Sequence, residues 1–176
     1  MPEPKRRLFF ALWPDDGVRT ALDVAGNALT GKRVRRVPAA NLHLTLAFAG
    51  PVTAEVAACL ERTAATIRAA AFELRIDHAG YWPRPRILWI GPTHVPSALW
   101  DLAGSLRNTL AGCGIEPETR GFQAHITLAR KLARGVADPE IPAVTWPVSN
   151  FCLVESASSE NGSVYRPLRC WPLEGG

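Results

Sequence analysis

A duplicated pattern of strand, helix and strand constrains the fold of this chain more than any other feature. RLFFALWP, a helix-like stretch and HLTLA occur in the first half, and RILWIGPT, a second helix-like stretch and HITLA follow in the second half. The interval from Phe9 to His43 is 34 positions, and that from Leu88 to His125 is 37. A chain of 176 residues can bury one good core but not two ordinary ones. We therefore expect one domain, residues 1–176, of two pseudo-symmetric lobes whose motifs face each other across a central cleft.

Hydrophobic periodicity and turn residues predict the individual elements. The expected strands cover residues 7–13, 34–37, 41–49, 72–82, 86–91, 123–129, 149–155 and 164–171. The expected helices begin near residues 15, 53 and 97 and end near residues 29, 70 and 111. Asn161-Gly162 predicts a hairpin between the last two strands, whereas the proline-rich residues 134–147 are expected to form a surface loop.

Basic residues are concentrated around the two repeated motifs. Of the 20 basic residues, 17 are arginine, a side chain well suited to bidentate phosphate contacts. No acidic residue lies between Asp23 and Glu55, or between Glu118 and Asp138. These acid-free windows contain Lys32, Arg33, Arg35 and Arg36, and Arg120, Arg130, Lys131 and Arg134. One such cluster is equally consistent with an ordinary solvated face, but two clusters around matching motifs favour an anionic ligand.

Cysteine spacing and the N-terminal region predict the compartment. The four cysteines lack CxxC spacing, so we expect buried small apolar side chains rather than disulfide partners or zinc ligands. They are Cys59, Cys113, Cys152 and Cys170. The apolar run of residues 8–13 is too short for a signal-peptide core or a membrane span. We therefore expect a cytoplasmic protein with no membrane partner.

Each motif places one histidine and one threonine on the same face of its strand, because strand side chains alternate. By strict alternation one face carries His43, Thr45 and Ala47, and on the second strand His125, Thr127 and Ala129. The opposite face carries Leu44, Leu46 and Phe48, and on the second strand Ile126, Leu128 and Arg130. Arg130 lies at the strand end, from which a long side chain can still reach a cleft.

Two histidines in matching contexts favour acid–base chemistry on phosphate. An isolated histidine is usually structural, and we expect this of His78 and His94. A neutral imidazole can act as general base while a protonated one acts as general acid, which is the combination that opens a cyclic phosphodiester. The hydroxyls of Thr45 and Thr127, with Arg130, would hold the non-bridging oxygens.

Several components of the site stay open or are expected to be absent. Two histidines without convergent carboxylates make a poor metal site, so we expect no metal and no cofactor. A base of the substrate could stack on Phe9, Phe48, Tyr81 or Trp82, each of which could equally be a core residue.

A family resemblance rests on several segments of the chain. They are HLTLAF, HITLAR, RLFFALWP, and Leu153-Val154-Glu155-Ser156 followed by Tyr165, Leu168 and Trp171. The chain resembles the 2H phosphoesterase superfamily, and within it the bacterial RNA 2′,3′-cyclic phosphodiesterase family, also called the 2′-5′ RNA ligase family. Ala49 and Ala124 depart from that pattern, where leucine and proline are usual.

The resemblance implies a bilobed α+β fold with antiparallel sheets that line a central cleft. It also implies metal-independent hydrolysis of RNA 2′,3′-cyclic phosphate ends to 2′-phosphomonoesters. It implies that His43 donates a proton to the leaving 3′ oxygen and that His125 accepts one from water. The expected partners are RNA 3′ ends or small nucleotides that bear a 2′,3′-cyclic phosphate, and we expect a monomer. Two alternatives stay open, namely 2′-5′ RNA ligation as the main activity and a non-catalytic module that binds a nucleotide or phosphate.

Overall fold

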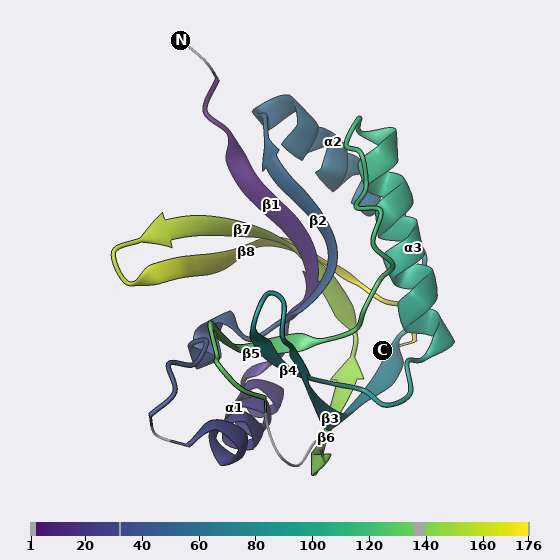
Figure 1. Ribbon diagram of the computed structural model, residues 1–176. Coiled ribbons are helices and arrows are strands. Elements are labelled where there is room, and N and C mark those ends of the chain that lie inside the picture. The colour runs from purple at the N-terminus through teal and green to yellow at the C-terminus, as the bar shows by residue number, and fades with distance from the viewer. Residues whose placement is uncertain (1–2, 32, 136–139, 176) are drawn as a thin grey trace.

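The protein is described by a computed structural model that covers residues 3–31, 33–135 and 140–175 (Figure 1). Its strands are β1 (Arg6–Leu12), β2 (Leu44–Val52), β3 (Phe72–Trp82), β4 (Ile87–Gly91), β5 (Ile126–Arg130), β6 (Glu140–Val148), β7 (Asn150–Ser159) and β8 (Gly162–Pro172). Its helices are α1 (Asp16–Thr30), α2 (Ala54–Ala64), α3 (Ser97–Gly112) and the short 3₁₀ helix η1 (Ala39–Asn41). The strands form an eight-stranded sheet in the order β6-β3-β4-β5-β2-β1-β7-β8 with antiparallel neighbours. The predicted α+β class is confirmed.

The sheet divides at its centre into two halves of four strands. Between β2 and β5 the register contains a single pair, Leu44 with Ile126, whereas β1 pairs with β2 and β4 pairs with β5 along several residues. The repeated units are thus β1-α1-β2 and β4-α3-β5, and the first residues of β2 and β5 meet at the junction. The two motifs therefore lie next to each other.

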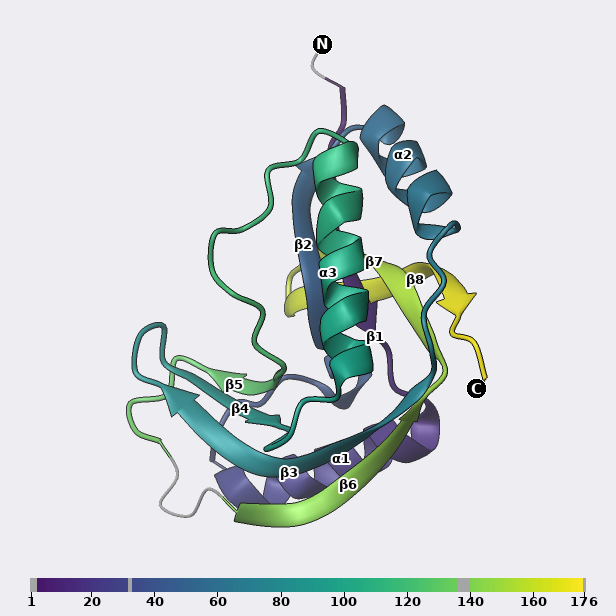
Figure 2. The ribbon, with the colours of Figure 1, turned by 90° about the vertical axis from the view of Figure 1, so that its right-hand side faces the viewer.

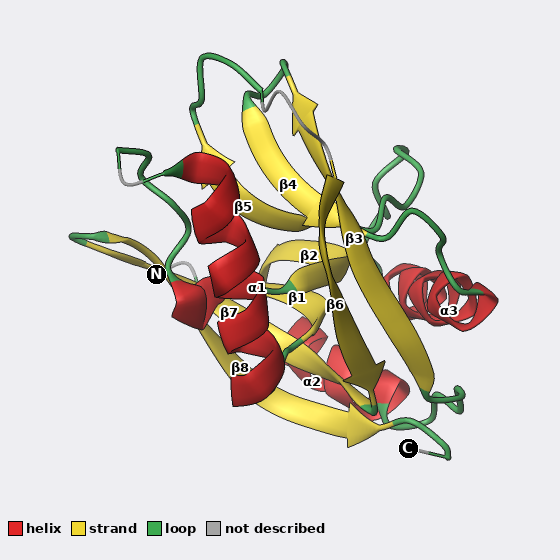
Figure 3. Cartoon of the chain, turned by 90° about the horizontal axis from the view of Figure 1, so that it is seen from below, coloured by secondary structure: helices red, strands yellow, loops and turns green. Residues whose placement is uncertain are grey.

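Each unit's helix packs against strands of the other half of the sheet. The helix α1 contacts β6, and α3 contacts β2, so that in Figure 2 α3 lies over β2 while α1 lies behind β3 and β6. Seen from below, β3 and β6 lie between α1 and α3 (Figure 3). Gly26 allows α1 its close approach, because a Cβ there would come within 3.0 Å of the Arg36 guanidinium and of the Leu128 side chain of β5. Because each helix packs against the other half of the sheet, the two units are held together.

The two faces of the sheet differ in what covers them. Leu8, Phe10 and Leu12 of β1 belong to the main core together with residues of all three α-helices. The alternate residues Phe9 and Ala11 point to the opposite face, where they form a smaller cluster with Cys152 and Val154 of neighbouring β7. The histidines of the motifs lie on the side of this smaller cluster, as the ring contacts described below show.

The expected surface loop at residues 134–147 is wrong over its second part, which is strand β6; residues 136–139 lie outside the described residues. Strand β6 is at one end of the sheet, and an edge strand tolerates proline because one side of its backbone needs no partner. Its buried residues Val144, Trp146 and Val148 alternate with exposed ones, and Ile141 lies beyond a register shift in the pairing with β3.

The following expected elements also differ from the structure. Residues 34–37 do not form a strand and contribute only an isolated bridge from Arg36 to Ala129. The helix that Thr53 caps ends at Ala64 rather than near residue 70. Both motif strands begin one residue after the histidine, at Leu44 and Ile126. The other expected strands and helices, and the hairpin at Asn161-Gly162, are confirmed.

The expectation that the cysteines are unpaired is wrong. Cys59 of α2 is bonded to Cys113 at the end of α3, and Cys152 of β7 is bonded to Cys170 of β8. The partners are 54 and 18 residues apart in the sequence, so only the packing of α2 on α3 and the register of the hairpin bring them together. None of the described helices is long and apolar enough to cross a membrane.

Candidate active site

The four polar residues of the two motifs converge at the junction between β2 and β5. Because Leu44 lies opposite Ile126 in an antiparallel pair, extending the register by one residue places His43 opposite Thr127 and His125 opposite Thr45. Directly opposed residues share a face and lie about 4.5–5.5 Å apart at Cα. The sheet thus brings together both histidines and both threonines that the sequence singled out.

The same β-bulge occurs in both motifs, three residues after the histidine. On β2, Thr45 pairs with Ala11 and Ala47 with Phe10, so Leu46 is unpaired. On β5, Thr127 pairs with Trp89 and Ala129 with Leu88, so Leu128 is unpaired. An extra residue of this kind resets the alternation of the side chains that follow it.

The bulges correct the faces expected for four residues. Arg130 pairs with Ile87, and therefore shares the face of His125 and Thr127 rather than the apolar face. Phe48 pairs with Phe9, and shares the face of His43 and Thr45. Ala47 and Ala129 move to the core face for the same reason. Arg130 is thereby brought into the site by the backbone, not only by the length of its side chain.

His43 is held by two hydrogen bonds and enclosed by three aromatic rings. Its Nδ1 lies 2.6 Å from the carbonyl oxygen of Asn41, and its Nε2 lies 3.0 Å from the Thr45 hydroxyl. A carbonyl only accepts, so Nδ1 donates, and the neutral ring accepts from Thr45 at Nε2. The rings of Phe9, Trp13 and Tyr165 have centroids 5.0, 5.8 and 5.1 Å from that of His43.

This enclosure lowers the pKa of His43 to about 4, mainly because burial penalises the charged ring. The hydrogen bond to Asn41 opposes that shift, while the nearby positive charges of His125, Arg130 and Arg19 add to it. At neutral pH the ring of the free protein is therefore uncharged.

His125 has the same main-chain contact in a different setting. Its Nδ1 lies 2.8 Å from the carbonyl oxygen of Gln123, which likewise leaves Nε2 free to accept a proton. The ring of Trp82 meets it edge-on at 4.6 Å, and Trp89 lies at 6.4 Å. Burial is the largest cause that lowers the pKa of His125, and the charges of Arg130 and Arg120 lower it further. Arg130 thus acts on both histidines.

A cavity of about 510 Å³ extends from His125 and Thr45 between β2, α3 and the segment that precedes β5. Its aromatic lining comes from Phe48, Trp82, Trp100 and Phe122, and its positive charges from Arg107 and Arg120. Such a mixture of aromatic faces and arginines suits a nucleoside with phosphate groups.

Two of the four candidate stacking residues, Phe48 and Trp82, line this cavity. Phe9 is only 3% exposed, and the Tyr81 hydroxyl donates to the Leu132 carbonyl oxygen at 2.7 Å. Sequence reasoning missed Trp100 and Arg107, which lie on α3 at the margin of its buried face, each next to a buried leucine in the sequence. Their spacing of seven residues, two helical turns, was the available signal.

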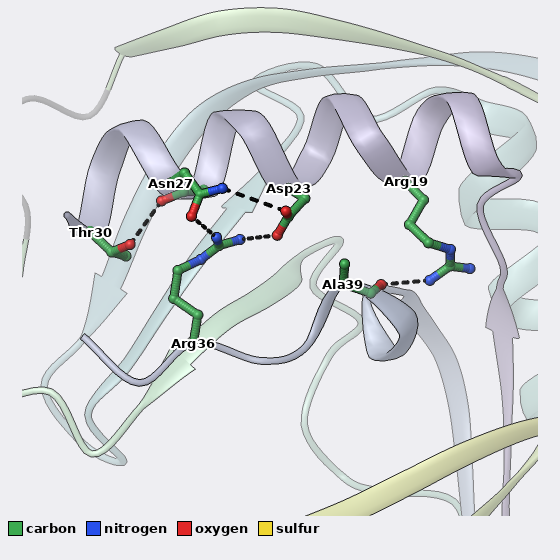
Figure 4. A network of polar contacts seen from close by, with 7 residues as sticks. Arg19, Asp23, Asn27, Thr30, Arg36 and Ala39 are labelled. Atoms are coloured by element: carbon green, nitrogen blue, oxygen red, sulfur yellow. Dashed lines mark hydrogen bonds and ion pairs between the residues drawn. The ribbon is translucent and has the colours of Figure 1, made fainter. Parts of the chain in front are cut away.

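The expected basic windows are only partly available to a ligand. Arg36 is paired with Asp23 of α1 at 2.8 Å, its side chain is 11% exposed, and it also donates to Asn27 (Figure 4). A window without acids in the sequence is therefore not free of acids in space, and the assignment of Arg36 to a ligand-binding surface is wrong. Lys32 lies outside the described residues, whereas the following remain exposed: Arg33, Arg35, Arg120, Arg130, Lys131 and Arg134.

Acidic, cysteine and histidine side chains do not form a group of three or more that could hold a metal ion, within the part of the chain that the structure describes. The motif residues and Arg130 offer imidazole, hydroxyl and guanidinium groups.

Comparison with known proteins gives consistent matches over nearly the whole chain. The family model of the 2′-5′ RNA ligase superfamily matches residues 14–160. An Escherichia coli (strain K12) protein named RNA 2′,3′-cyclic phosphodiesterase is 38% identical over 176 residues, covering 98% of this chain and 99% of its own. A protein of the same name from Aeropyrum pernix is 32% identical over 155 residues, covering 80% and 87%.

Solved structures agree with the sequence matches. Escherichia coli LigT in apo form superposes with a TM-score of 0.88 at 35% identity, covering 97% of this chain and 99% of that one. A structure described as a phosphoesterase gives a TM-score of 0.90 at 36% identity, with the same coverage of both chains. Escherichia coli LigT complexed with 3′-AMP gives 0.88 at 35% identity, again covering 97% and 99%.

Proposed function

The chain belongs to the 2′-5′ RNA ligase superfamily, and we propose that it hydrolyses RNA 2′,3′-cyclic phosphate ends to 2′-phosphomonoesters. The observation that carries this proposal is the cross-strand arrangement of two histidines and two threonines at the single pair Leu44–Ile126. Relatives that match most of the chain are named RNA 2′,3′-cyclic phosphodiesterase, which supports the same reaction.

In the proposed reaction a water oxygen attacks phosphorus and the bond to the 3′ oxygen breaks. His125 accepts the water proton at Nε2, and His43 donates a proton from Nε2 to the leaving 3′ oxygen, which leaves the phosphate on the 2′ oxygen. His43 must first be protonated, although its pKa is about 4 in the free protein. A bound phosphodiester anion would favour the protonated ring, so substrate binding would itself prepare the acid.

The phosphate would be held by Thr45, Thr127 and Arg130. Once His43 is protonated, its Nε2 no longer accepts from Thr45, and the Thr45 hydroxyl is free to donate to a non-bridging oxygen. Arg130 shares this face because of the bulge at Leu128, and a guanidinium suits both the bound anion and the charge that develops in the transition state. The nucleoside that bears the phosphate would lie in the cavity against Trp82 and Phe48.

Two variants test the acid–base assignment. His43→Ala and His125→Ala should each reduce hydrolysis of a short RNA that ends in a 2′,3′-cyclic phosphate by at least about 10²-fold, with circular dichroism unchanged. Activity at the wild-type level in either folded variant would contradict the mechanism. Activity should also persist in excess EDTA; loss restored by a divalent ion would indicate a metal enzyme instead.

The alternatives lead to different products. If ligation to a 5′-hydroxyl RNA were the main activity, a mixture of both ends would give a 2′-5′ linked product faster than a 2′-phosphate. A binding module would give neither. Water is present at a far higher concentration than a second RNA end, so we expect hydrolysis to dominate.

The remaining exposed arginines would contact the RNA chain beyond its terminal nucleotide. If so, the Kd for a ten-nucleotide RNA should rise with salt more steeply than that for a nucleoside 2′,3′-cyclic phosphate. Equal salt dependence would count against an RNA-binding surface. A cytoplasmic location and a monomeric state stay predictions from the sequence.

A further inference from the structure

Asn41, two residues before His43, is buried and uses both ends of its side-chain amide. It is 8% exposed. Its Nδ2 donates to the Ser163 carbonyl oxygen at 2.8 Å, and its Oδ1 accepts from the Tyr165 main-chain nitrogen at 3.4 Å. Both partners are on β8, which ends the sheet. The side chain therefore occupies the place that a further strand would take along part of this edge.

The main chain of Asn41 holds His43 at the same time. Its carbonyl oxygen accepts from His43 Nδ1, and its own nitrogen donates to the Pro38 carbonyl oxygen at 2.8 Å within η1. The ring of Tyr165, whose nitrogen Asn41 binds, meets the His43 ring edge-on at 5.1 Å. Asn41 thus contacts both strand β8 and His43. Tyr165 of the same strand helps to enclose the His43 ring.

We propose that Asn41 is a positioning residue for the hydrolytic reaction, because it clamps β8 onto η1 and thereby fixes the carbonyl oxygen and the Tyr165 ring that hold His43. This inference rests on the proposed function. It assigns to the β7–β8 hairpin, which extends away from α2 and α3 in Figure 1, a part in aligning the first histidine.

Comparison with the surroundings of His125 shows why His43 needs the contact between Asn41 and β8. Gln123 occupies the equivalent position before His125 and also offers its carbonyl oxygen, but it is exposed. The rings next to His125 are Trp82 and Trp89, which β3 and β4 fix through their own strand pairing. Tyr165, in contrast, lies near the turn of a hairpin whose outer strand is an edge, so it needs a contact from outside the hairpin.

Asn41→Ala is the first test. With the clamp removed, β8 can move away and water can reach the His43 ring, so kcat should fall about tenfold while KM stays within about twofold. An NMR titration should show the pKa of His43 rising from about 4 towards the ordinary value of a histidine. The charged and titratable groups that face this ring are Arg19 from α1, Arg130 from β5, His125 and Tyr165, and none of them is altered.

Val144→Ala is the matched control for a general loss of stability, because Val144 is buried on β6 at the opposite edge of the sheet. It should leave kcat and the His43 pKa unchanged. If Asn41→Ala does not fold, Tyr165→Leu takes its place and should give the same two changes. If both fold, the double variant should be no worse than either single variant, since both act through the same wall of the His43 site.

The outcomes separate this inference from the function on which it rests. Unchanged kcat and unchanged His43 pKa in Asn41→Ala, or in Tyr165→Leu where that variant is used, would overturn the positioning role even if His43→Ala is inactive. Fully additive effects in the double variant would overturn the clamp. A fully active His43→Ala would instead overturn the proposed mechanism.

Discussion

Thr45 makes contact with His43 before any substrate is bound. Its hydroxyl lies 3.0 Å from His43 Nε2, and in the proposed reaction the same hydroxyl turns to a phosphate oxygen. Thr45→Val keeps the shape and removes this donor, so kcat/KM should fall about 10²-fold, as for other lost donors to a developing negative charge. Thr45→Ser keeps the donor and should stay within about tenfold of wild type. Equal losses in both variants would show that Thr45 acts by packing alone.

Arg130 is the residue whose removal should change both histidines. Burial is the largest cause of their lowered pKa values, and the positive charge of Arg130 adds to it in both. Arg130→Gln removes that charge, which makes protonation easier, so the pKa of His43 and the pKa of His125 should both rise in an NMR titration. The kcat/KM for the cyclic phosphate should fall about 10²-fold. The exposed Arg134, changed to Gln, serves as control for the two pKa values; a rise of the same size there would assign the effect to net charge.

At the scale of elements, the motif strands illustrate what a sequence can and cannot predict. The convergence of His43, Thr45, His125 and Thr127 followed from the repeat and from alternation. The face of Arg130 did not, because a bulge depends on which residues of the neighbouring strand are paired, and that register is tertiary information. Once the bulge at Leu46 is known, the repeat itself predicts the one at Leu128.

The network between α1 and the segment before η1 is the element-scale feature that we expect to govern stability. Arg36 bonds Asp23 and Asn27 of α1, while Arg19 donates to the Ala39 carbonyl oxygen at 2.7 Å (Figure 4). Arg36→Ala leaves Asp23 without this partner and should lower the free energy of unfolding by about 2 kcal/mol in urea titrations. Arg33→Ala, at an exposed position, should change it by less than about 0.5 kcal/mol. Similar values for the two variants would contradict a structural role of Arg36.

At the scale of the whole molecule, the sequence could not predict that each unit's helix packs against the other half of the sheet. Apolar periodicity predicted α1 and α3, whose buried residues include Leu22 and Leu106, but such a period does not say which strands a helix covers. Since α1 packs on β6 and α3 on β2, neither unit could bury its helix alone. We propose on this basis that residues 1–176 are one domain with two pseudo-symmetric lobes.

The two disulfides give a direct test of the whole chain's chemistry. A thiol assay of the denatured protein should find no free thiol before reduction and four after it. Reduction of Cys59–Cys113 opens a link across 54 residues and should cost about 4 kcal/mol in the free energy of unfolding. Four free thiols in protein purified without reductant would contradict both bonds. They would agree with the cytoplasmic location expected from the sequence, since disulfides are rare there.

His43 should make the stability of the whole molecule depend on pH in a defined window. Its pKa is about 4 in the folded chain and about 6.5 when unfolded, so above pH 6.5 both states hold it neutral. As the pH falls from 6.5 to 4, His43 becomes protonated in the unfolded chain but stays largely neutral in the folded protein. The free energy of unfolding should therefore decrease, by up to about 3 kcal/mol from this residue, and His125 acts in the same direction.

Urea titrations at pH 7, 5.5 and 4 measure this dependence. His43→Gln replaces the ring by a side chain that does not titrate, and should give a shallower decrease over that range. Glu155, whose pKa is lowered chiefly by its hydrogen bond to Arg6, loses its contribution near and below the lower end of the window in wild type and variant alike, so it cancels in the comparison. Parallel curves for the two proteins would show that folded His43 is protonated as easily as the unfolded chain, and that its enclosure by Phe9, Trp13 and Tyr165 does not set its charge.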